Sequence, residues 1–347
     1  MTYILMGVFL ILYVAVVAAG MKYTSEKHTF FDSHDVCVMK GMFSIIVILV
    51  HIPLSYQNRI QDMMGSFAYI GVTFFFMASG FGLKWGMVNK KDYINAFWVK
   101  RLPKILLPAL FCNFLHVIIN VYKGVNNITI WSFLSIDAWV RVLLLYYFLF
   151  WLVYYIFHKL NIEGDFKDII ICLVVVSCSL IDRLTPLKLT LIWPTESLGF
   201  AYGIILFHYL DRLKKWSGEG WLAKSGYLIL LGGITGSAYL KFKTVEFWGD
   251  YCLKIFLGIV LLTLMLHLTV RIIIGNKVNI FLGEISYEMF LLHGVIFGIV
   301  EYCFKKSSSG VFVWLSVIIT IAFASVIHCL CRFLLGLCGK GLKKIVN

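Results

Sequence analysis

Long apolar runs separated by short polar segments follow one another along the whole chain. Lipid offers no partners for backbone N–H and C=O groups, so each run of about 20 residues predicts a transmembrane helix. A membrane β-barrel is excluded because the runs do not alternate between apolar and polar positions. The pattern therefore predicts an all-α fold, a polytopic transmembrane helix bundle of about eleven spans. The spans are expected at residues 2–21, 36–54, 66–88, 105–122, 139–158, 168–181, 189–209, 221–240, 251–273, 281–302 and 311–334.

The composition indicates the same class. Of the 347 residues, 61% are hydrophobic and only 14% are charged, and the mean hydropathy is +0.88. These values are typical of a membrane protein rather than of a domain with one buried core. No loop is long enough to hold a soluble domain, so any chemistry must take place within the bundle. Two spans fit the pattern least well, 168–181 because it is short and 189–209 because it contains Pro194.

Lys and Arg residues are unevenly distributed over the loops. Twenty of the 31 fall in alternate loops that begin with residues 22–35, ten fall in the other loops, and Lys40 lies at the edge of a span. Loops rich in Lys and Arg stay in the cytoplasm. We therefore expect a multi-pass protein of the plasma (inner) membrane, with its N-terminus outside and its C-terminus in the cytoplasm. This topology accounts for the net charge of +13, so no nucleic-acid partner is needed.

The first apolar run ends in Ala-Ala-Gly, which resembles the cleavage site of a signal peptide. A signal peptide begins with a positively charged segment, however, and no Lys or Arg precedes this run. We therefore expect a retained helix. The nine cysteines lie mostly inside spans, and they show no zinc-site spacing with one another or with histidines. No metal cofactor is expected.

A basic residue and a histidine lie eleven positions apart in the second span, in the segment MKGMFSIIVILVHI. Eleven residues are about three helical turns, so Lys40 and His51 lie on one face, roughly 16 Å apart, with Ser44 and Val47 on the same stripe. Charged and titratable groups are costly in hydrocarbon unless they meet a partner or a cavity. The pair therefore predicts a polar cavity that starts at one membrane surface and ends near the middle.

The third span and the basic loop after it supply further candidates. Ser79 and Gly80 follow an aromatic run, a place where small residues also serve close helix packing. The loop carries Arg101 and Lys104, three positions apart at the start of a helix, followed by Pro108. This segment fits either an ordinary cytoplasmic loop or a cradle for an anion.

Two later spans carry isolated polar residues. Glu196 lies at membrane depth beside Pro194, and a carboxylate there indicates a function because of its cost in lipid. Ser286 and His293 lie seven positions apart on one face of the tenth span, although a hydrogen bond to a neighbouring helix would also explain the histidine. At 1.5 Å per residue, His51 and His293 lie roughly 16 and 12 Å from the inner boundary, where they could share one cavity.

In this order, the segments resemble the motifs of the acyltransferase-3 family of integral membrane O-acyltransferases. That family has a basic residue separated by ten positions from a histidine, and then a phenylalanine-rich segment ending in SGF or SGY. A basic stretch with a proline follows, and near the end comes G-x-[IL]-S-Y with a Leu-His pair. The matching features here are Lys40 with His51, TFFFMASGFGL, Arg101 with Lys104 and Pro108, and GEISYEMFLLH.

The resemblance covers roughly residues 36–295, with two departures. Lys40 stands where arginine is commoner, and Cys37 stands where an aspartate is often found. The family core has ten spans. We therefore expect residues 1–35 to form an extra N-terminal transmembrane helix and a cytoplasmic loop, and residues 36–347 to form the membrane acyltransferase domain.

The resemblance implies transfer of an acyl group, usually acetyl, from cytoplasmic acyl-CoA to a hydroxyl of a cell-envelope or exported glycan or its lipid-linked precursor. Acetyl-CoA would be a co-substrate, and the partners would be acyl-CoA, the glycan and membrane lipids. A positioned histidine can take the proton of the hydroxyl as it attacks the thioester. The residues expected in catalysis are His51, Glu196 and His293, and those expected to hold the donor are Lys40, Ser79, Arg101 and Lys104.

Two other functions remain open at this point. A secondary transporter or flippase for a lipid-linked sugar would also have polar residues at the midplane and broken helices. The sequence shows no inverted repeat, which argues against that class. A family member without activity that serves as a membrane scaffold is a third possibility, and the presence of His51 argues against it.

Overall fold

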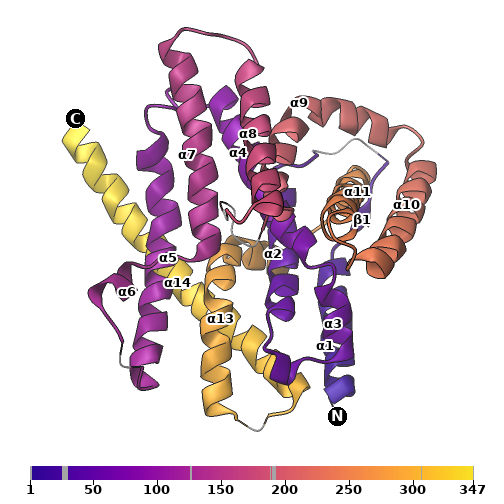
Figure 1. The fold of residues 1–347 in the computed structure, drawn as a ribbon, viewed down its shortest axis with the longest axis vertical. Coiled ribbons are helices and arrows are strands. Elements are labelled where there is room, and N and C mark those ends of the chain that lie inside the picture. Colours follow the sequence, from indigo (N-terminus) through magenta and orange to yellow (C-terminus); the bar gives the residue numbers. More distant parts are fainter. Residues whose placement is uncertain are drawn as a thin grey trace.

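The computed structural model describes residues 2–25, 30–125, 127–187, 189, 193–305 and 307–346. These residues form an almost wholly helical fold, which confirms the all-α prediction (Figure 1). Two short strands, β1 (Lys22–Tyr23) and β2 (Ile272–Ile273), pair antiparallel. The α-helices are α1 Thr2–Ala18, α2 Ser33–Val50, α3 Arg59–Gly65, α4 Tyr69–Asn89, α5 Phe97–Tyr122, α6 Ile130–Leu134, α7 Ala138–Lys159, α8 Phe166–Leu184, α9 Gly199–Gly218, α10 Trp221–Phe242, α11 Lys254–Thr269, α12 Lys277–Glu284, α13 Ser286–Cys303 and α14 Ser309–Val346.

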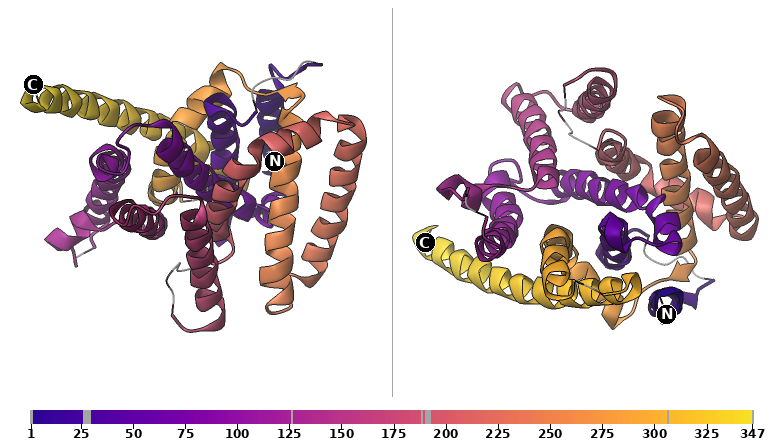
Figure 2. Two further views of the ribbon diagram at one scale, coloured as in Figure 1. Left: turned by 90° about the horizontal axis from the view of Figure 1, so that it is seen from above. Right: turned by 60° about the horizontal axis from the view of Figure 1, so that its bottom comes forward.

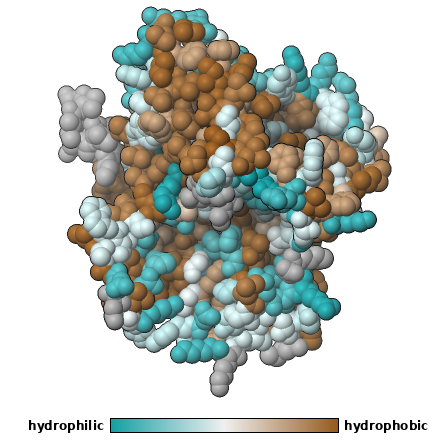
Figure 3. All heavy atoms as spheres, in the orientation of Figure 1, coloured by the Kyte–Doolittle hydropathy of each residue, from teal (hydrophilic) through white to brown (hydrophobic). Residues whose placement is uncertain are grey.

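Each of the eleven predicted spans overlaps one of these helices. Five helices in the described part of the chain are long and apolar enough to cross a membrane, and α12 with α13 would make a sixth as one bent span. Hydrophobic side chains dominate the upper part of the surface in Figure 3. Helices α7 and α8 expose large hydrophobic side chains, among them Phe148 and Leu173. These features are those of a membrane protein, and the number of eleven spans stays a prediction.

The seventh predicted span differs most from the observed helix. It was expected over 189–209, whereas α9 begins at Gly199 and continues to Gly218. Pro194 lies five residues before this helix, and a proline cannot donate the hydrogen bond that a helix interior needs. A single 3-10 turn, Glu196–Leu198, leads into α9. Residues 190–192 of the predicted span lie outside the described residues.

Glycines allow α4 and α9 to pack at very short range. A side chain at Gly80 would run into the carbonyl oxygen of Phe200, and one at Gly203 would run into the carbonyl oxygen of Met77. Small residues permit such close approach between helices in a membrane. The pair of helices thereby forms the centre of the larger hydrophobic core, which includes Phe76 and Phe200.

A sharp bend separates α12 from α13, where the two helices meet at 71°. The short helix α12 packs tightly on α2: a side chain at Gly283 would meet the carbonyl oxygen of Cys37, and one at Gly41 would lie 2.6 Å from the carbonyl oxygen of Asn279. α14 then runs along one side of the bundle, against α13, α5 and α1 (Figure 2). The bend places the first turn of α13 beside the middle of α2.

The loops gather at two ends of the bundle. At one end, β1 pairs with β2, and Arg271 donates hydrogen bonds to the carbonyl oxygens of Ser25 and Gly218. At the other end, Ser309 donates to the carbonyl oxygen of Tyr56, and Trp314 donates to that of Leu5. The first end carries three of the loops expected in the cytoplasm. The side of the membrane on which each end lies stays a prediction.

Candidate active site

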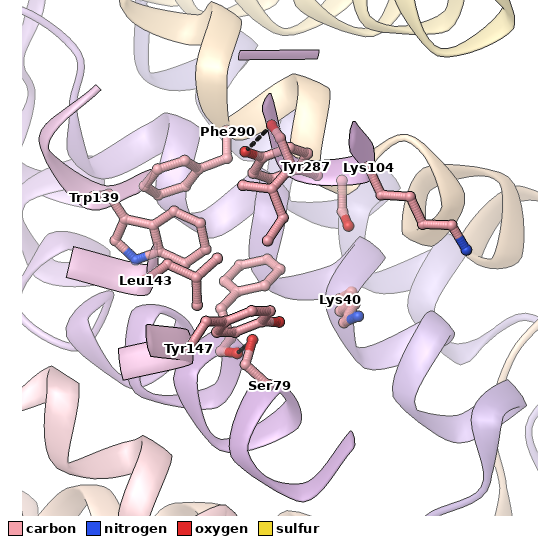
Figure 4. A pocket seen from close by; sticks show the side chains of 11 residues that line it. Lys40, Ser79, Lys104, Trp139, Leu143, Tyr147, Tyr287 and Phe290 are labelled. Atoms are coloured by element: carbon pink, nitrogen blue, oxygen red, sulfur yellow. Dashed lines mark hydrogen bonds between the residues drawn. The ribbon is translucent and has the colours of Figure 1, made fainter. Parts of the chain in front are cut away.

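Two adjoining cavities lie beside the first turns of α2. Lys40, Ser79 and Tyr147 line both of them, the larger with a volume of 700 Å³ and the smaller with 190 Å³. Arg101 lies on the wall of the larger cavity and Lys104 on the wall of the smaller one. In Figure 4, Lys40 and Lys104 lie on one side of the smaller cavity, across from Trp139 and Leu143. The four residues predicted to hold the donor therefore lie together.

The larger cavity is positively charged. Lys40, Arg101 and Lys214 lie on its wall, and Asp32 is the one carboxylate among its described lining residues. The Asp32 side chain caps α2, where it accepts hydrogen bonds from the backbone N–H groups of His34 and Asp35. Because this carboxylate is engaged at a helix N-terminus, the cations dominate the cavity, which suits an anionic ligand.

Tyr93 fixes the position of Arg101. The Nε and Nη2 groups of Arg101 donate hydrogen bonds of 3.0 and 2.6 Å to the Tyr93 hydroxyl oxygen. The Tyr93 ring in turn packs on Gly86, where an added Cβ would lie 2.6 Å from the ring. Burial raises the pKa of the Tyr93 phenol, although the neighbouring guanidinium lowers it. The phenol therefore stays neutral and orients Arg101 without cancelling its charge.

Two neighbouring residues of the segment SGF have different roles, since one lines the cavities and the other allows close helix packing. Ser79 faces both cavities, and its hydroxyl donates a 2.9 Å hydrogen bond to the carbonyl oxygen of Phe75. Gly80, the next residue, lies on the face that packs against α9. Both interpretations of this segment therefore hold, each for a different residue: Ser79 lines the cavities, and Gly80 serves helix packing.

The segment GEISY forms the far wall of the smaller cavity. Ser286 and Tyr287, at the start of α13, both line it. The Tyr287 hydroxyl donates a 2.9 Å hydrogen bond to the carbonyl oxygen of Ile105, which ties α13 to α5 (Figure 4). Phe290, one turn further along α13, closes the cavity together with Trp139, and the two ring centroids are 4.7 Å apart.

The two predicted histidines lie in contact at the other end of α2. The ring centroids of His51 and His293 are 4.8 Å apart. His51 Nδ1 lies 2.8 Å from the carbonyl oxygen of Val47, and His293 Nδ1 lies 2.5 Å from that of Phe290. A carbonyl oxygen only accepts, so each Nδ1 must carry a proton. The Nε2 atom of each neutral ring then keeps its lone pair, as a general base requires.

The stripe between Lys40 and His51 is packed in this structure. Ser44 is buried, with its hydroxyl 2.8 Å from the carbonyl oxygen of Gly41 and 3.7 Å from the sulfur of Met289. Val47 is buried as well. The polar cavity predicted to run from Lys40 to His51 is therefore not open along this stripe, and the two cavities reach only Lys40. The Phe290 ring, 5.8 Å from that of His293, lies between the smaller cavity and the histidines.

Glu196 is paired with a cation from a distant part of the sequence. Its carboxylate forms a 2.6 Å ion pair with Lys254 of α11 and accepts a 2.7 Å hydrogen bond from Thr195. The Lys254 ammonium also lies over the Tyr69 ring, at 4.9 Å from its centroid. Glu196 is not among the residues that line the two cavities beside Lys40.

Sequence reasoning missed four residues at these sites, namely Tyr93, Tyr147, Lys214 and Lys254. Tyr93 lies eight positions before Arg101 in a loop, and no helical spacing links the two residues. Lys214 was counted only as a cytoplasmic charge. Lys254 lies 58 positions from Glu196. A buried carboxylate does, however, signal that some cation should be sought among the spans.

Among the described residues, two groups of carboxylates and histidines lie close enough to hold a metal ion, with ligand atoms within 4.8 Å of one another. Asp32 belongs to the first group and serves as a helix cap. Asp168 belongs to the second, where Lys84 approaches its carboxylate to 2.5 Å and Tyr154 donates to its other oxygen. Lys84 therefore supplies the positive charge that this carboxylate needs in the bundle.

A family model described as an acyltransferase domain matches residues 33–329. The helical bundle and this match together define a membrane acyltransferase. The chain belongs to the acyltransferase-3 family. The matched range begins at the first residue of α2 and contains all seven predicted site residues. No match to a curated protein or to a solved structure was found.

Proposed function

We propose that this acyltransferase moves an acyl group, acetyl in the simplest case, from cytoplasmic acyl-CoA to a hydroxyl of a cell-envelope or exported glycan. The observation that carries the proposal is the arrangement along α2. A cation-lined cavity opens beside its first turn, and the His51–His293 pair lies just past its last residue, with His51 as the C-cap. The donor and the reacting hydroxyl would then approach from opposite ends of one helix.

The cavities suit the parts of a coenzyme A thioester. The larger one falls within the size range of ligand pockets, and its cations suit the phosphates. Arg101, held by Tyr93, would make the directional contacts, and Lys40, Lys104 and Lys214 would add charge. The smaller cavity is narrow and partly aromatic, which suits the pantetheine arm. The arm would carry the thioester toward Phe290 and, beyond it, His293.

The chemistry requires one acyl substitution and two proton transfers, one to the base and one from it. The Nε2 atom of His51 or His293 takes the proton of the glycan hydroxyl while its oxygen attacks the thioester carbonyl carbon. The new C–O bond forms, the C–S bond breaks, and the thiolate of coenzyme A leaves and takes up the proton from the imidazolium. General-base help of this kind contributes about 10² to 10⁴ in rate. His51 is the more exposed of the two rings and is assigned as the base.

The proposal is tested by replacing His51 with Ala and measuring O-acetylation of the envelope glycans in cells. Loss of general-base catalysis should lower acetylation at least 100-fold, about 10² being the smaller of the usual contributions. His158, exposed in the last turn of α7, provides a matched control, and His158→Ala should acetylate normally. With equal amounts of protein in the membrane, wild-type acetylation by His51→Ala would refute the assignment.

A further inference from the structure

A polar pocket lies at the end of the bundle opposite the cation-lined cavity. Its volume is 530 Å³, within the range of small-molecule sites. Its walls come from the N-terminus of α1, the segment that follows α2 and the start of α14. The lining residues, all polar, are Thr2, Tyr3, Gln57, Asn58, Arg59 and Ser309.

Hydrogen bonds within the chain hold this pocket in shape. Asn58 donates a 2.8 Å hydrogen bond to the Ser309 hydroxyl, which itself donates to the carbonyl oxygen of Tyr56. Gln57 donates a 3.1 Å hydrogen bond to the carbonyl oxygen of Ile52. The segment after α2 is thereby fixed to α14, so the polar groups of the pocket are positioned before a ligand arrives.

A line of aromatic rings connects the pocket to the histidine pair. Tyr56, which precedes Gln57, stacks on Phe312 with centroids 3.9 Å apart. Phe312 contacts Phe297 at 6.0 Å, and Phe297 contacts His293 at 5.6 Å. The pocket and the predicted base therefore lie at the same end of α2. This helix of 18 residues is roughly 27 Å long, and the cation-lined cavity lies at its other end.

The lining chemistry selects the class of ligand. Hydroxyl and carboxamide groups both donate and accept hydrogen bonds, as sugar hydroxyls do, and the Arg59 guanidinium offers a fork of donors. The exposed Tyr3 ring adds a flat face. A lipid chain would offer no hydrogen-bond partner to the Arg59 guanidinium, which is costly for a charged group. A polyhydroxylated ligand fits the pocket best.

We propose that this pocket binds a sugar unit of the acceptor glycan that neighbours the unit being acylated. Binding there would hold the chain so that the reacting hydroxyl lies at His51, and the remote contacts would lower the entropic cost of reaching the transition state. The inference rests on the proposed function, because it takes the bound glycan to be the acyl acceptor.

The test measures binding of a defined probe to the full-length protein in lipid nanodiscs. The probe is polysaccharide isolated from the producing cells and freed of its acyl groups by mild alkali. Arg59→Gln and Tyr3→Ala alter exposed side chains of the pocket. Lys241→Gln removes an exposed charge on α10, away from the pocket, as the control. Transfer of acetyl from acetyl-CoA is measured on the same samples.

Each pocket variant should weaken glycan binding about tenfold, the effect of losing one good polar or stacking contact, and Lys241→Gln should bind like wild type. Coenzyme A binding should be equal in all four proteins. Equal glycan affinity in all four would overturn the inference, even with normal acetyl transfer. If binding depends on the pocket but the wild type transfers no acetyl, the pocket stands and the proposed acyl transfer fails.

Discussion

Arg101 lies on the wall of the cavity proposed to bind the donor, and its position is well defined because two of its N–H groups donate to one phenol oxygen. The guanidinium is half-buried and faces a cavity with a single, already engaged carboxylate among its described lining residues. Its interaction with an incoming phosphate should therefore be stronger than that of a freely exposed surface charge. The same geometry makes Tyr93 a positioning residue.

Arg101→Gln should raise the KM for acetyl-CoA about tenfold or more and leave the KM for the glycan nearly unchanged, because only the donor's phosphates lose a partner. Tyr93→Phe should raise the donor KM by a smaller factor, since the guanidinium remains but loses its orientation. Initial rates of the purified protein at varied acetyl-CoA concentrations provide the measurement.

Two further substitutions control this prediction. Lys100→Gln removes a neighbouring, exposed charge that is not among the residues lining the cavity, and should leave the donor KM unchanged. Lys40→Arg keeps the charge at the cavity wall and should be tolerated. A donor KM that does not respond to Arg101→Gln would show that the phosphates bind elsewhere.

At the residue scale, the spacing of residues along a helix was enough to predict which side chains share one face. Lys40 and His51 were placed on one face of a helix, and His51 and His293 were expected to reach one cavity. In the structure the two imidazole rings are in contact, and the shared cavity stays a prediction. The partner of Glu196, in contrast, could not be predicted from helical spacing. The cost of a buried carboxylate indicates that it needs a partner, but nothing local identifies Lys254, which folding brings to it from α11.

At the scale of the elements, α4 has two glycines two positions apart with opposite surroundings. Gly80 faces the backbone of α9, whereas an added Cβ at Gly82 would have nothing within 4 Å. Alanine is favoured over glycine by about 1 kcal/mol in a helix interior where space permits. Alanine substitutions at Gly80 and Gly82 therefore distinguish the effect of helix packing from that of helix propensity.

Gly80→Ala should lower the melting temperature of the purified protein in detergent by several degrees, because its methyl group would force α4 and α9 apart. Gly82→Ala on the same helix should leave the melting temperature unchanged or raise it slightly. Scanning calorimetry of the two variants beside the wild type gives the comparison. Equal melting temperatures would mean that the α4–α9 contact is looser than described.

Helix boundaries were predictable where apolar runs are uniform and were not where backbone geometry intervenes. α7 and α10 lie close to their predicted spans. The span expected at 189–209 is a helix only from Gly199, because Pro194 interrupts it. The bend of 71° between α12 and α13 could not be predicted in this way, because neither helix contains a proline. Beside the bend, Gly41 and Gly283 allow α12 to pack closely on α2, a contact between helices that are far apart in sequence.

At the scale of the whole molecule, α2 connects two chemically different ends. The cation-lined cavity at its start suits a phosphorylated donor, and the polar pocket after its end suits a sugar. The uneven distribution of Lys and Arg predicts that the first end is cytoplasmic. The sequence alone indicated the cation-lined end of α2, because Lys and Arg residues are concentrated in the loops expected there. The polar pocket could not be predicted from the sequence, because its residues come from three distant segments with no shared motif.

The most direct test of transfer from one end to the other uses inside-out membrane vesicles from cells that produce the protein. Radiolabelled acetyl-CoA, which cannot cross the membrane, is added outside, where it meets the cytoplasmic face. The account predicts that label appears on glycan inside the vesicles and resists an added esterase until detergent opens them. His51→Ala vesicles should remain unlabelled. Label that the esterase removes without detergent, or equal labelling by His51→Ala, would contradict the account.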